Sequence, residues 1–330
     1  MTVLPGLRGN DALGFLAAVG LLSLSEQGEL PELRLGWGRG ASPTGIIEGD
    51  VDSVEELSEQ LRAAFTRVRE TDVVIPGVPS EIPKRKLGSG KDPMRMSREQ
   101  MQELYRQIDA LWIEGNPWPA RWIAALAAQA AVDDERRVAL TPFYAPTGQM
   151  AMRTSIFEKT MVAVEKVGGP GDALTGWRRL AYDGANFDER ARRDAGVTTS
   201  GKATNQGAPS PTWLAAMGLR FFPMTDDGRR TATVGWQRVR LYPRPYTTRS
   251  LIWPIWAEAL DPVAVRTLLT HPAMVVRQSE GRITPAKPRE LRALGVTHVF
   301  GASRRTLEQG DSPLGPARLL WSASTMPMSS

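Results

Sequence analysis

The spacing of apolar residues changes along this chain, and that change limits the fold more than any other feature. In the first half, apolar residues recur every three or four positions, as in residues 12–24, which predicts helices. Later segments read as strands: 231–241, 250–256, 296–302 and 317–324. The chain is therefore expected to be α+β, with a helix-rich N-terminal region and a more strand-rich C-terminal region around a mixed or antiparallel sheet, and with no Rossmann or P-loop core.

Helix starts are marked by local capping signals. Asn10 or Asp11 can cap the helix over 12–24, and Ser53 with Glu56 forms a capping box ahead of a helix that reaches residue 68. Further helices are predicted over 97–111, where Ser97 and Gln100 form a second capping box, and over the Ala-rich 117–131 and 150–167.

One short segment occurs twice in similar form. Phe15-Leu-Ala-Ala-Val-Gly-Leu-Leu near the start resembles Trp213-Leu-Ala-Ala-Met-Gly-Leu-Arg. Because glycine favours the left-handed conformation that ends many helices, both copies are interpreted as helices that end at Gly20 and Gly218. A single pair is weak evidence for an internal duplication.

Two irregular segments suggest how the chain is organised. Residues 76–96 combine prolines and glycines with cations, which predicts an exposed basic loop, and residues 183–211 read as a long polar loop. We expect an N-terminal lobe over 1–141 that carries the first loop and a C-terminal lobe over 142–330 that carries the second. A single body is the alternative.

Charge is distributed unevenly between the two ends. Residues 1–75 hold six basic and twelve acidic side chains, whereas residues 220–330 hold sixteen basic and eight acidic ones. Almost all of the basic side chains in 220–330 are arginine, whose planar fork of donors suits phosphate. The alternative is a genome composition that favours arginine codons throughout. The acidic N-terminal part is expected to face protein or solvent.

Several chemistries are disfavoured by composition. The chain has no cysteine and only two histidines, His271 and His298, which the local sequence presents as a cap and a packed side chain. No G-x-S-x-G elbow occurs, and no lysine follows an acidic residue at the two-residue offset common in metal-dependent nucleases. We therefore expect no catalytic residues, no metal and no cofactor, and a protein that is not an enzyme.

Two local matches are interpreted as accidental. The segment 196–203 departs from the phosphate-binding loop pattern by one residue, but its flanks lack the required strand and helix. Asp183, Asp188 and Asp194 are expected to form a solvated surface paired with neighbouring arginines. The apolar run over 12–24 follows Asp11, lacks a cleavage site and is too short to span a bilayer, so a cytoplasmic protein without membrane contact is expected.

The two irregular loops supply the first candidates for contacts with nucleic acid. We expect the cations of the first loop to contact a DNA backbone and the polar side chains of the second loop to read base edges. The DNA-binding candidates are Lys84, Arg85, Lys86, Lys91, Arg95, Lys202, Asn205 and Gln206.

A second candidate surface lies in the segment 229–249, where arginine and aromatic residues alternate. Residues two apart on a strand share one face, so Trp236, Arg238, Arg240 and Tyr242 are expected to line a single surface suited to base stacking and phosphate pairing. The alternative is a sheet edge that is protected by charge.

Four landmarks together resemble a known family. They are the run from Leu7 to Leu22, the segment Thr141-Pro-Phe-Tyr-Ala-Pro-Thr-Gly-Gln-Met, the run Trp213-Leu-Ala-Ala-Met-Gly-Leu-Arg-Phe-Phe-Pro, and Trp253-Pro-Ile-Trp. Their order across most of the chain is similar to that of the large-subunit-like proteins of type I-U/I-G CRISPR effector complexes, the Csb group.

That resemblance implies a non-catalytic subunit of an RNA-guided, Cascade-type complex for antiviral defence. Its partners would be guide RNA, double-stranded target DNA, the other Cascade-type subunits and a recruited helicase-nuclease, and it would bind the target and check the protospacer-adjacent motif. Two rival readings stay open: a metal-dependent nuclease or other stand-alone nucleic-acid enzyme, and a protein whose arginines bind acidic protein surfaces.

Overall fold

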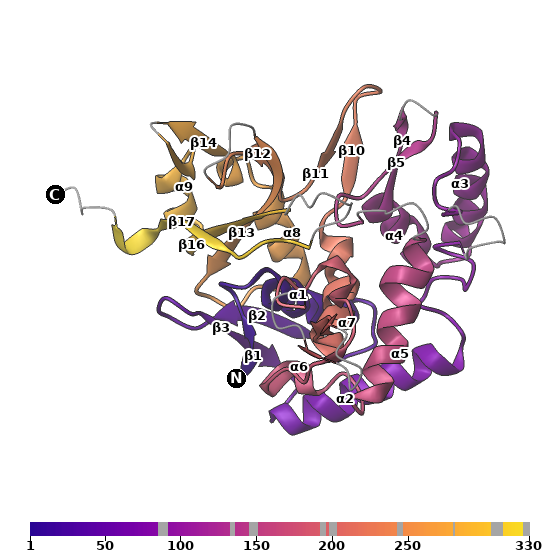
Figure 1. The fold of residues 1–330 in the computed structure, drawn as a ribbon, viewed down its shortest axis with the longest axis horizontal. Helices are drawn as coiled ribbons and strands as arrows, with labels where there is room; N and C mark the ends of the chain where they lie inside the picture. The colour runs from indigo at the N-terminus through magenta and orange to yellow at the C-terminus, as the bar shows by residue number, and fades with distance from the viewer. Residues whose placement is uncertain are drawn as a thin grey trace.

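Two buried helices form the centre of the molecule, with two sheets on one side and a group of helices on the other (Figure 1). The computed structural model describes residues 1–84, 92–132, 136–144, 151–191, 196–197, 203–242, 247–279, 281–304 and 313–325. Helices and antiparallel sheets occur together, which confirms the predicted α+β class. Among the helices within these ranges, none has the length and apolar content needed to cross a membrane.

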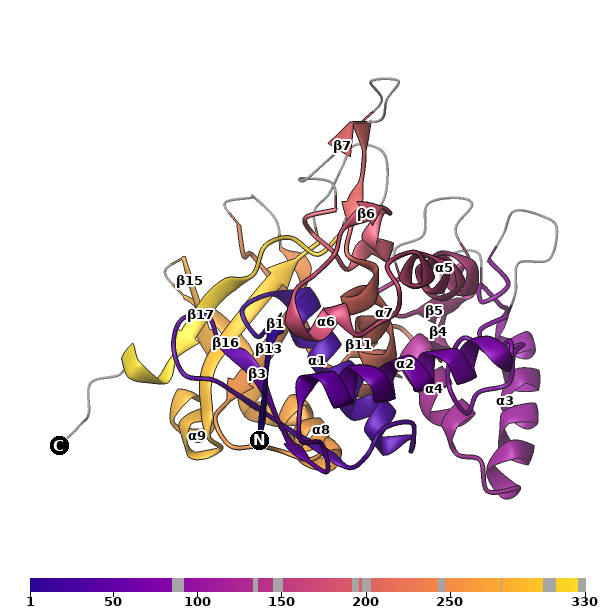
Figure 2. The same cartoon turned by 90° about the horizontal axis from the view of Figure 1, so that it is seen from below.

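The central helices are α1 (Ala12–Glu26) and α7 (Pro209–Gly218). The Asp11 carboxylate caps α1 by accepting the Leu13 N–H at 2.8 Å, as predicted. Both helices are buried around their whole circumference, rather than along one stripe, because elements pack against every face. Figure 2 shows the pair from below, surrounded by the other elements.

The two similar segments of the sequence pack against each other. A Cβ added to Gly20 would lie 1.9 Å from the Leu214 carbonyl oxygen, and one added to Gly218 would lie 2.5 Å from the Leu16 carbonyl oxygen. Leu16 and Leu214 hold equivalent places in the two segments, so the contact is reciprocal. Gly20 lies in the interior of α1, so the prediction that the helix ends there is wrong. α7 does end at Gly218, but with φ of −71°, so no left-handed cap is present. These glycines allow two backbones to approach.

The first strands form a three-stranded antiparallel sheet in the order β1-β3-β2. This sheet packs against α1. Its strands are β1 (Thr2–Arg8), β2 (Leu33–Trp37) and β3 (Thr44–Gly49).

The helices opposite the sheets begin with the predicted caps. The Ser53 hydroxyl accepts the Glu56 N–H at 3.1 Å, and both bonds of the predicted box are present between Ser97 and Gln100. The group consists of α2 (Val54–Glu70), α3 (Arg98–Ile113), α4 (Trp118–Leu126), the π-helical η1 (Arg153–Glu158) and α5 (Lys159–Lys166). The short helix α6 (Asp172–Thr175) packs instead against β1 of the first sheet.

The C-terminal half is built on a four-stranded antiparallel sheet in the order β12-β13-β16-β17. Shorter elements flank it. The strands are β12 (Trp236–Val239), β13 (Thr248–Trp256), β16 (Val296–Ser303) and β17 (Arg318–Ser322), and the flanking elements are α8 (Pro262–Thr270), η4 (Pro272–Met274), β14 (Val276–Ser279), β15 (Arg282–Pro285), α9 (Pro288–Ala293) and η5 (Ala323–Thr325).

Two-stranded pairs project from this body. The remaining elements are β4 (Ala127–Val132) with β5 (Val138–Leu140), β6 (Leu180–Ala181) with β9 (Gln206–Gly207), β7 (Gly196–Val197) with β8 (Ala203–Thr204), β10 (Met224–Asp226) with β11 (Thr231–Thr233), and the 3-10 turns η2 (Gly184–Asn186) and η3 (Leu219–Phe221).

Two predicted boundaries are wrong for reasons of tertiary pairing. The helix expected over 117–131 ends at Leu126, because the alanines that follow pair with β5 as strand β4. The single strand expected over 231–241 is divided between β11 and β12 by Gly235, whose φ of +75° suits glycine.

Aromatic residues join the two sheets through α1. The Phe15 ring stacks on Trp253 with 5.7 Å between centroids, and Trp37 meets Trp256 edge-on at 6.0 Å. The Trp253 indole N–H donates to the Gly9 carbonyl at 2.8 Å. One continuous core thus includes residues on both sides of position 141.

Candidate nucleic-acid interface

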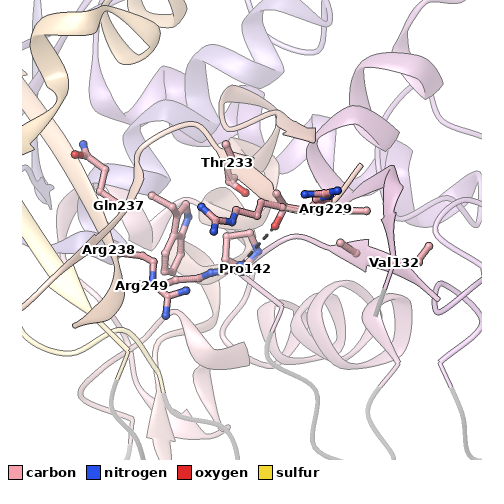
Figure 3. Close-up of a pocket in the computed structure, with 13 residues that line it drawn as sticks. Val132, Pro142, Arg229, Thr233, Gln237, Arg238 and Arg249 are labelled. Carbon is pink, nitrogen blue, oxygen red and sulfur yellow. Dashed lines mark hydrogen bonds between the residues drawn. The ribbon is translucent and has the colours of Figure 1, made fainter. Parts of the chain in front are cut away.

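An open cavity of about 370 Å³ lies where three pieces of chain meet: the hairpins β4–β5 and β10–β11 and the edge strand β12 (Figure 3). Thirteen residues line it, four of which are arginines and none of which is acidic. In Figure 3 Arg238 and Arg249 lie on one side of the cavity, and Arg229 lies across it near Val132. We call this the arginine cavity.

Arg238 and Arg249 are direct cross-strand partners. The register of β12 and β13 places them opposite each other, so their side chains leave the same face of the sheet. Both are exposed. Within the described part of the chain neither forms an ion pair, and the one side-chain bond of Arg249 is a long contact of 3.5 Å to the Thr231 hydroxyl. Like charges directly opposite each other destabilise a sheet.

Arg229 and Arg230 extend from the turn of the β10–β11 hairpin. The Asp227 carboxylate accepts both backbone N–H groups, from Arg230 at 2.7 Å and from Arg229 at 2.9 Å, and so fixes the turn. These hydrogen bonds, the one from Arg230 first, lower the pKa of Asp227. The turn therefore adds two cations to the lining of the cavity that also contains the Arg238–Arg249 pair.

The walls of the cavity are fastened to one another. Asp226 on β10 accepts the Ala130 N–H of β4 at 2.9 Å. The Gln237 amide ties β12 to the start of β14, donating to the Met274 carbonyl at 2.8 Å and accepting the Val276 N–H at 2.9 Å. These contacts place the arginines on a fixed frame before any ligand binds.

The aromatic residues predicted for this surface are engaged with neighbours. The Trp236 ring meets Phe143 edge-on at 5.1 Å, and the Arg304 guanidinium lies 5.7 Å above it. The Tyr242 hydroxyl donates to the Pro316 carbonyl at 2.7 Å. Phe143 and Pro142, which lines the cavity, both belong to one of the four landmark segments.

The four residues predicted to share one surface do not stay together: three are divided between two cavities, and Tyr242 is not in the lining of either one. Trp236 and Arg238 line the arginine cavity, whereas Arg240 lines a different one with Arg282 and Arg318. The alternation itself holds, since Val239 is buried and Arg238 and Arg240 are exposed. Strand β12 is the edge of its sheet, as the rival interpretation required.

The lining of the arginine cavity determines which chemistry it supports. Its lining includes four arginines, two threonines and one glutamine, and among the described residues that line it there is no carboxylate or imidazole. Guanidinium groups form paired, charge-assisted hydrogen bonds with phosphate oxygens. The arrangement is suited to holding an anion with several negative charges.

Only four of the eight residues predicted on the two loops are described by the structure. Lys84 and Arg95 are half-buried and do not line the arginine cavity, and Arg85, Lys86, Lys91 and Lys202 lie outside the described residues. Asn205 and Gln206 pack against the segment 180–191, where the Asn205 carbonyl accepts the Tyr182 N–H at 3.1 Å and the Gln206 amide donates to the Thr204 hydroxyl at 3.1 Å. Of the predicted loop residues, the four that the structure describes do not line the cavity.

The segment that resembles a phosphate-binding loop is flanked by strands. Gly196 pairs with Thr204, and Val197 pairs with Ala203, as an antiparallel hairpin. A phosphate-binding loop would begin a helix at that point.

The aspartates that a nuclease would need are bound to separate partners. Asp188 is buried and pairs with Arg179 at 2.8 Å, and it also accepts the Ala208 N–H at 3.0 Å. Asp183 pairs with Lys159, and Asp194 lies outside the described residues. The expectation of a solvated surface is wrong for Asp188, whose carboxylate connects the segment before α7 to the start of that helix. Across the ranges that the structure describes, no group of three or more acidic or histidine side chains is placed to hold a metal ion.

Both histidines occupy the predicted kinds of position. The His271 Nδ1 atom accepts the Ala273 N–H at 3.2 Å as a cap. His298 stacks on Phe300 in β16, and partial burial lowers its pKa.

Three lining arginines were missed at the level of individual residues. Arg229, Arg230 and Arg249 lie inside the basic segment 229–249 but outside the alternation counted there. Their placement depends on a hairpin turn and on the register between β12 and β13, and neither can be read from a pattern of alternate residues. The wall contributed by β4–β5 is distant in sequence and carries no local signal.

The four landmarks behind the family resemblance are largely structural. They supply α1, α7, the Phe143 contact and the Trp253–Trp256 portion of β13, all in the core. A scan against protein-family models finds no family that matches this chain, and a search of curated proteins finds no match.

Proposed function

We propose that this chain binds the phosphate backbone of nucleic acid in the arginine cavity, as a non-catalytic subunit of a cytoplasmic, RNA-guided DNA-surveillance complex. Guide RNA and target DNA are its ligands, and the other Cascade-type subunits and a recruited helicase-nuclease are its partners. The observation that carries the proposal is the pair Arg238 and Arg249, which forms no ion pair among the described residues and lines one cavity together with Arg229 and Arg230.

The Arg238–Arg249 pair is costly for the free protein. Two like charges directly opposite in a sheet destabilise it by up to about 1 kcal/mol, although solvent screens exposed side chains such as these. An anion bound between them turns the repulsion into two attractions. The arrangement is therefore expected where ligand binding, rather than stability, determines the residues.

The number of guanidiniums favours phosphate over a carboxylate of a protein partner. Four arginines around about 370 Å³ match a ligand with closely spaced negative charges, and successive phosphates provide these. The rings of Trp236 and Tyr242 are held by neighbours, so base stacking contributes little. Binding should therefore be largely independent of base sequence.

The assignment to a Cascade-type complex rests on the family resemblance of the sequence. Within such a complex a sequence-independent cation cavity would hold a strand while base pairing with the guide reads its sequence. Reading of the protospacer-adjacent motif would then belong to Lys202, Asn205 and Gln206, and the cations around Lys84 would hold the DNA backbone near that motif.

Fluorescence anisotropy with labelled DNA and RNA oligonucleotides at low ionic strength tests the binding. Changing both Arg229 and Arg230 to glutamine should weaken binding about tenfold or more, with little dependence on base sequence. Arg289→Gln, an exposed arginine of α9 that does not line the cavity, is the matched control and should bind like the unmodified protein. Equal binding by all three proteins would reject the cavity as the site.

Co-purification tests the assembly. Expression of the chain with the genes beside its own should yield a complex that contains a guide RNA. A chain that purifies alone, free of RNA, would contradict the proposed complex while leaving the binding measurement intact.

A further inference from the structure

We propose that the ligand of the arginine cavity is a single strand, which continues along β12 into a second cavity lined by Arg240, Arg282 and Arg318. This inference rests on the proposed function and specifies its ligand. The second cavity has a volume of about 390 Å³, and none of its lining residues is acidic.

The two cavities are lined by neighbouring residues of one stretch of chain, because Arg238 belongs to β12 and Arg240 directly follows its last residue, Val239. Arg238 lines the first and Arg240 the second, and both are exposed while Val239 and Leu241 are buried. Two residues of extended chain span roughly 7 Å, so the two guanidiniums leave the same face one step apart. A backbone that tracks the strand meets one cation after the other.

The second cavity is organised by side chains that are already held. The Arg318 guanidinium donates to the Leu241 carbonyl and lies 5.6 Å above the Tyr242 ring. Arg282, from hairpin β14–β15, is exposed and has no ion-pair partner among the described residues. Arg240 and Arg282 are therefore the cations available to a ligand.

An apolar side chain lies beside these cations. Leu319, on the edge strand β17, lines the cavity with 54% of its surface exposed. Cations alternating with apolar surface suit a single strand, whose phosphates and unstacked bases both need partners. In a duplex the bases are stacked inside, so Leu319 would have no base face to cover.

The size of the cavities also favours a single strand. Each holds a few hundred Å³, which is in the range of sites for small ligands. A duplex presents two backbones on either side of a groove roughly 12 Å wide, and it would lie across the openings without entering either one.

The test compares oligothymidylates of two, four, eight and twelve nucleotides by fluorescence anisotropy. The variant carries Arg240→Gln and Arg282→Gln, which remove charge and leave the Arg318 contacts in place. We expect its affinity for the twelve-nucleotide strand to fall about tenfold while its affinity for the dinucleotide stays within twofold. Arg289→Gln is the control, and a twelve-base-pair duplex should bind more weakly than the strand of the same length.

Each other outcome rejects a defined part of the account. If the double variant binds every length like the unmodified protein, the second cavity is not on the path. If the duplex binds more tightly than the strand, the ligand is not single-stranded. If the unmodified protein binds no oligonucleotide, the proposed function itself is rejected. Equal thermal unfolding of variant and control establishes that folding is unaffected.

Discussion

Replacement of Arg249 by glutamine should change stability and binding in opposite directions. In the free protein it removes one of two like charges that β12 and β13 place opposite each other, and it removes only one long hydrogen bond of 3.5 Å. We expect the free energy of unfolding to rise by about 0.5 kcal/mol. In the complex the variant loses a charge-assisted contact worth about 1.5 kcal/mol, so affinity should fall roughly tenfold.

Urea unfolding followed by tryptophan fluorescence, together with anisotropy of a labelled strand, measures both effects. The variants Arg238→Gln, Arg249→Gln and their combination form a double-mutant cycle. Once one charge is gone, removal of the second should add no stability, although binding should weaken further. Arg289→Gln should change neither quantity. If the Arg249 variant is less stable than the parent and binds equally well, the pair is structural and our reasoning is wrong.

Three other changes test the fold and the loop assignment. Gly20→Ala should lower the free energy of unfolding by about 3 kcal/mol or more, because its Cβ would lie 1.9 Å from the Leu214 carbonyl oxygen. The control Gly45→Ala, whose Cβ would meet no atom closer than 3.5 Å, should lower it much less. If both variants unfold at the same urea concentration, the close contact at Gly20 is refuted. Burial alone would raise the pKa of Glu26, but the hydrogen bond from Arg266 and the charge of Arg220 outweigh burial and lower that pKa. The stability that this carboxylate provides should therefore be lost as the pH falls below about 4.5. Glu26→Gln should remove that part of the acid dependence. It should also lower the free energy of unfolding by about 3 kcal/mol at neutral pH, because it leaves the buried Arg220 without its carboxylate partner. Urea unfolding of the unmodified protein that does not change between pH 7 and pH 3 would contradict this account. Replacing residues 84–86 together with alanine should weaken DNA binding by the assembled complex in a mobility-shift assay without affecting assembly, and unchanged binding would refute the role of that loop.

Local signals were sufficient for the helix starts. Asp11, Ser53 and Ser97 cap helices as their sequences predict, because a cap depends on residues within one turn. Where the helices end depends on contacts with residues that are distant in the sequence. Gly20 resembles a helix terminator in sequence, but the molecule uses it to bring α1 against α7, and the alanines after Leu126 become a strand because β5 is available.

In the candidate site too, some features could be predicted from local sequence and others depend on distant partners. Alternation along β12 correctly separated the exposed Arg238 and Arg240 from the buried Val239, because that pattern is local to one strand. The partner of Arg238 could not be predicted, since a loop of unknown geometry sets the register that places Arg249 opposite. The division into two cavities comes from hairpins β10–β11 and β14–β15, whose docking has no signature in a single sequence.

The salt dependence of binding tests the central claim most directly. In the variant that lacks the cations Arg240 and Arg282, the four arginines of the arginine cavity remain to neutralise phosphates of a single strand, so the logarithm of the binding constant should fall with the logarithm of salt concentration with a slope of about −3. Changing Arg238 and Arg249 to glutamine should reduce that slope by about half. A slope near zero, or one that these changes leave unaltered, would contradict binding of a phosphate backbone in the arginine cavity.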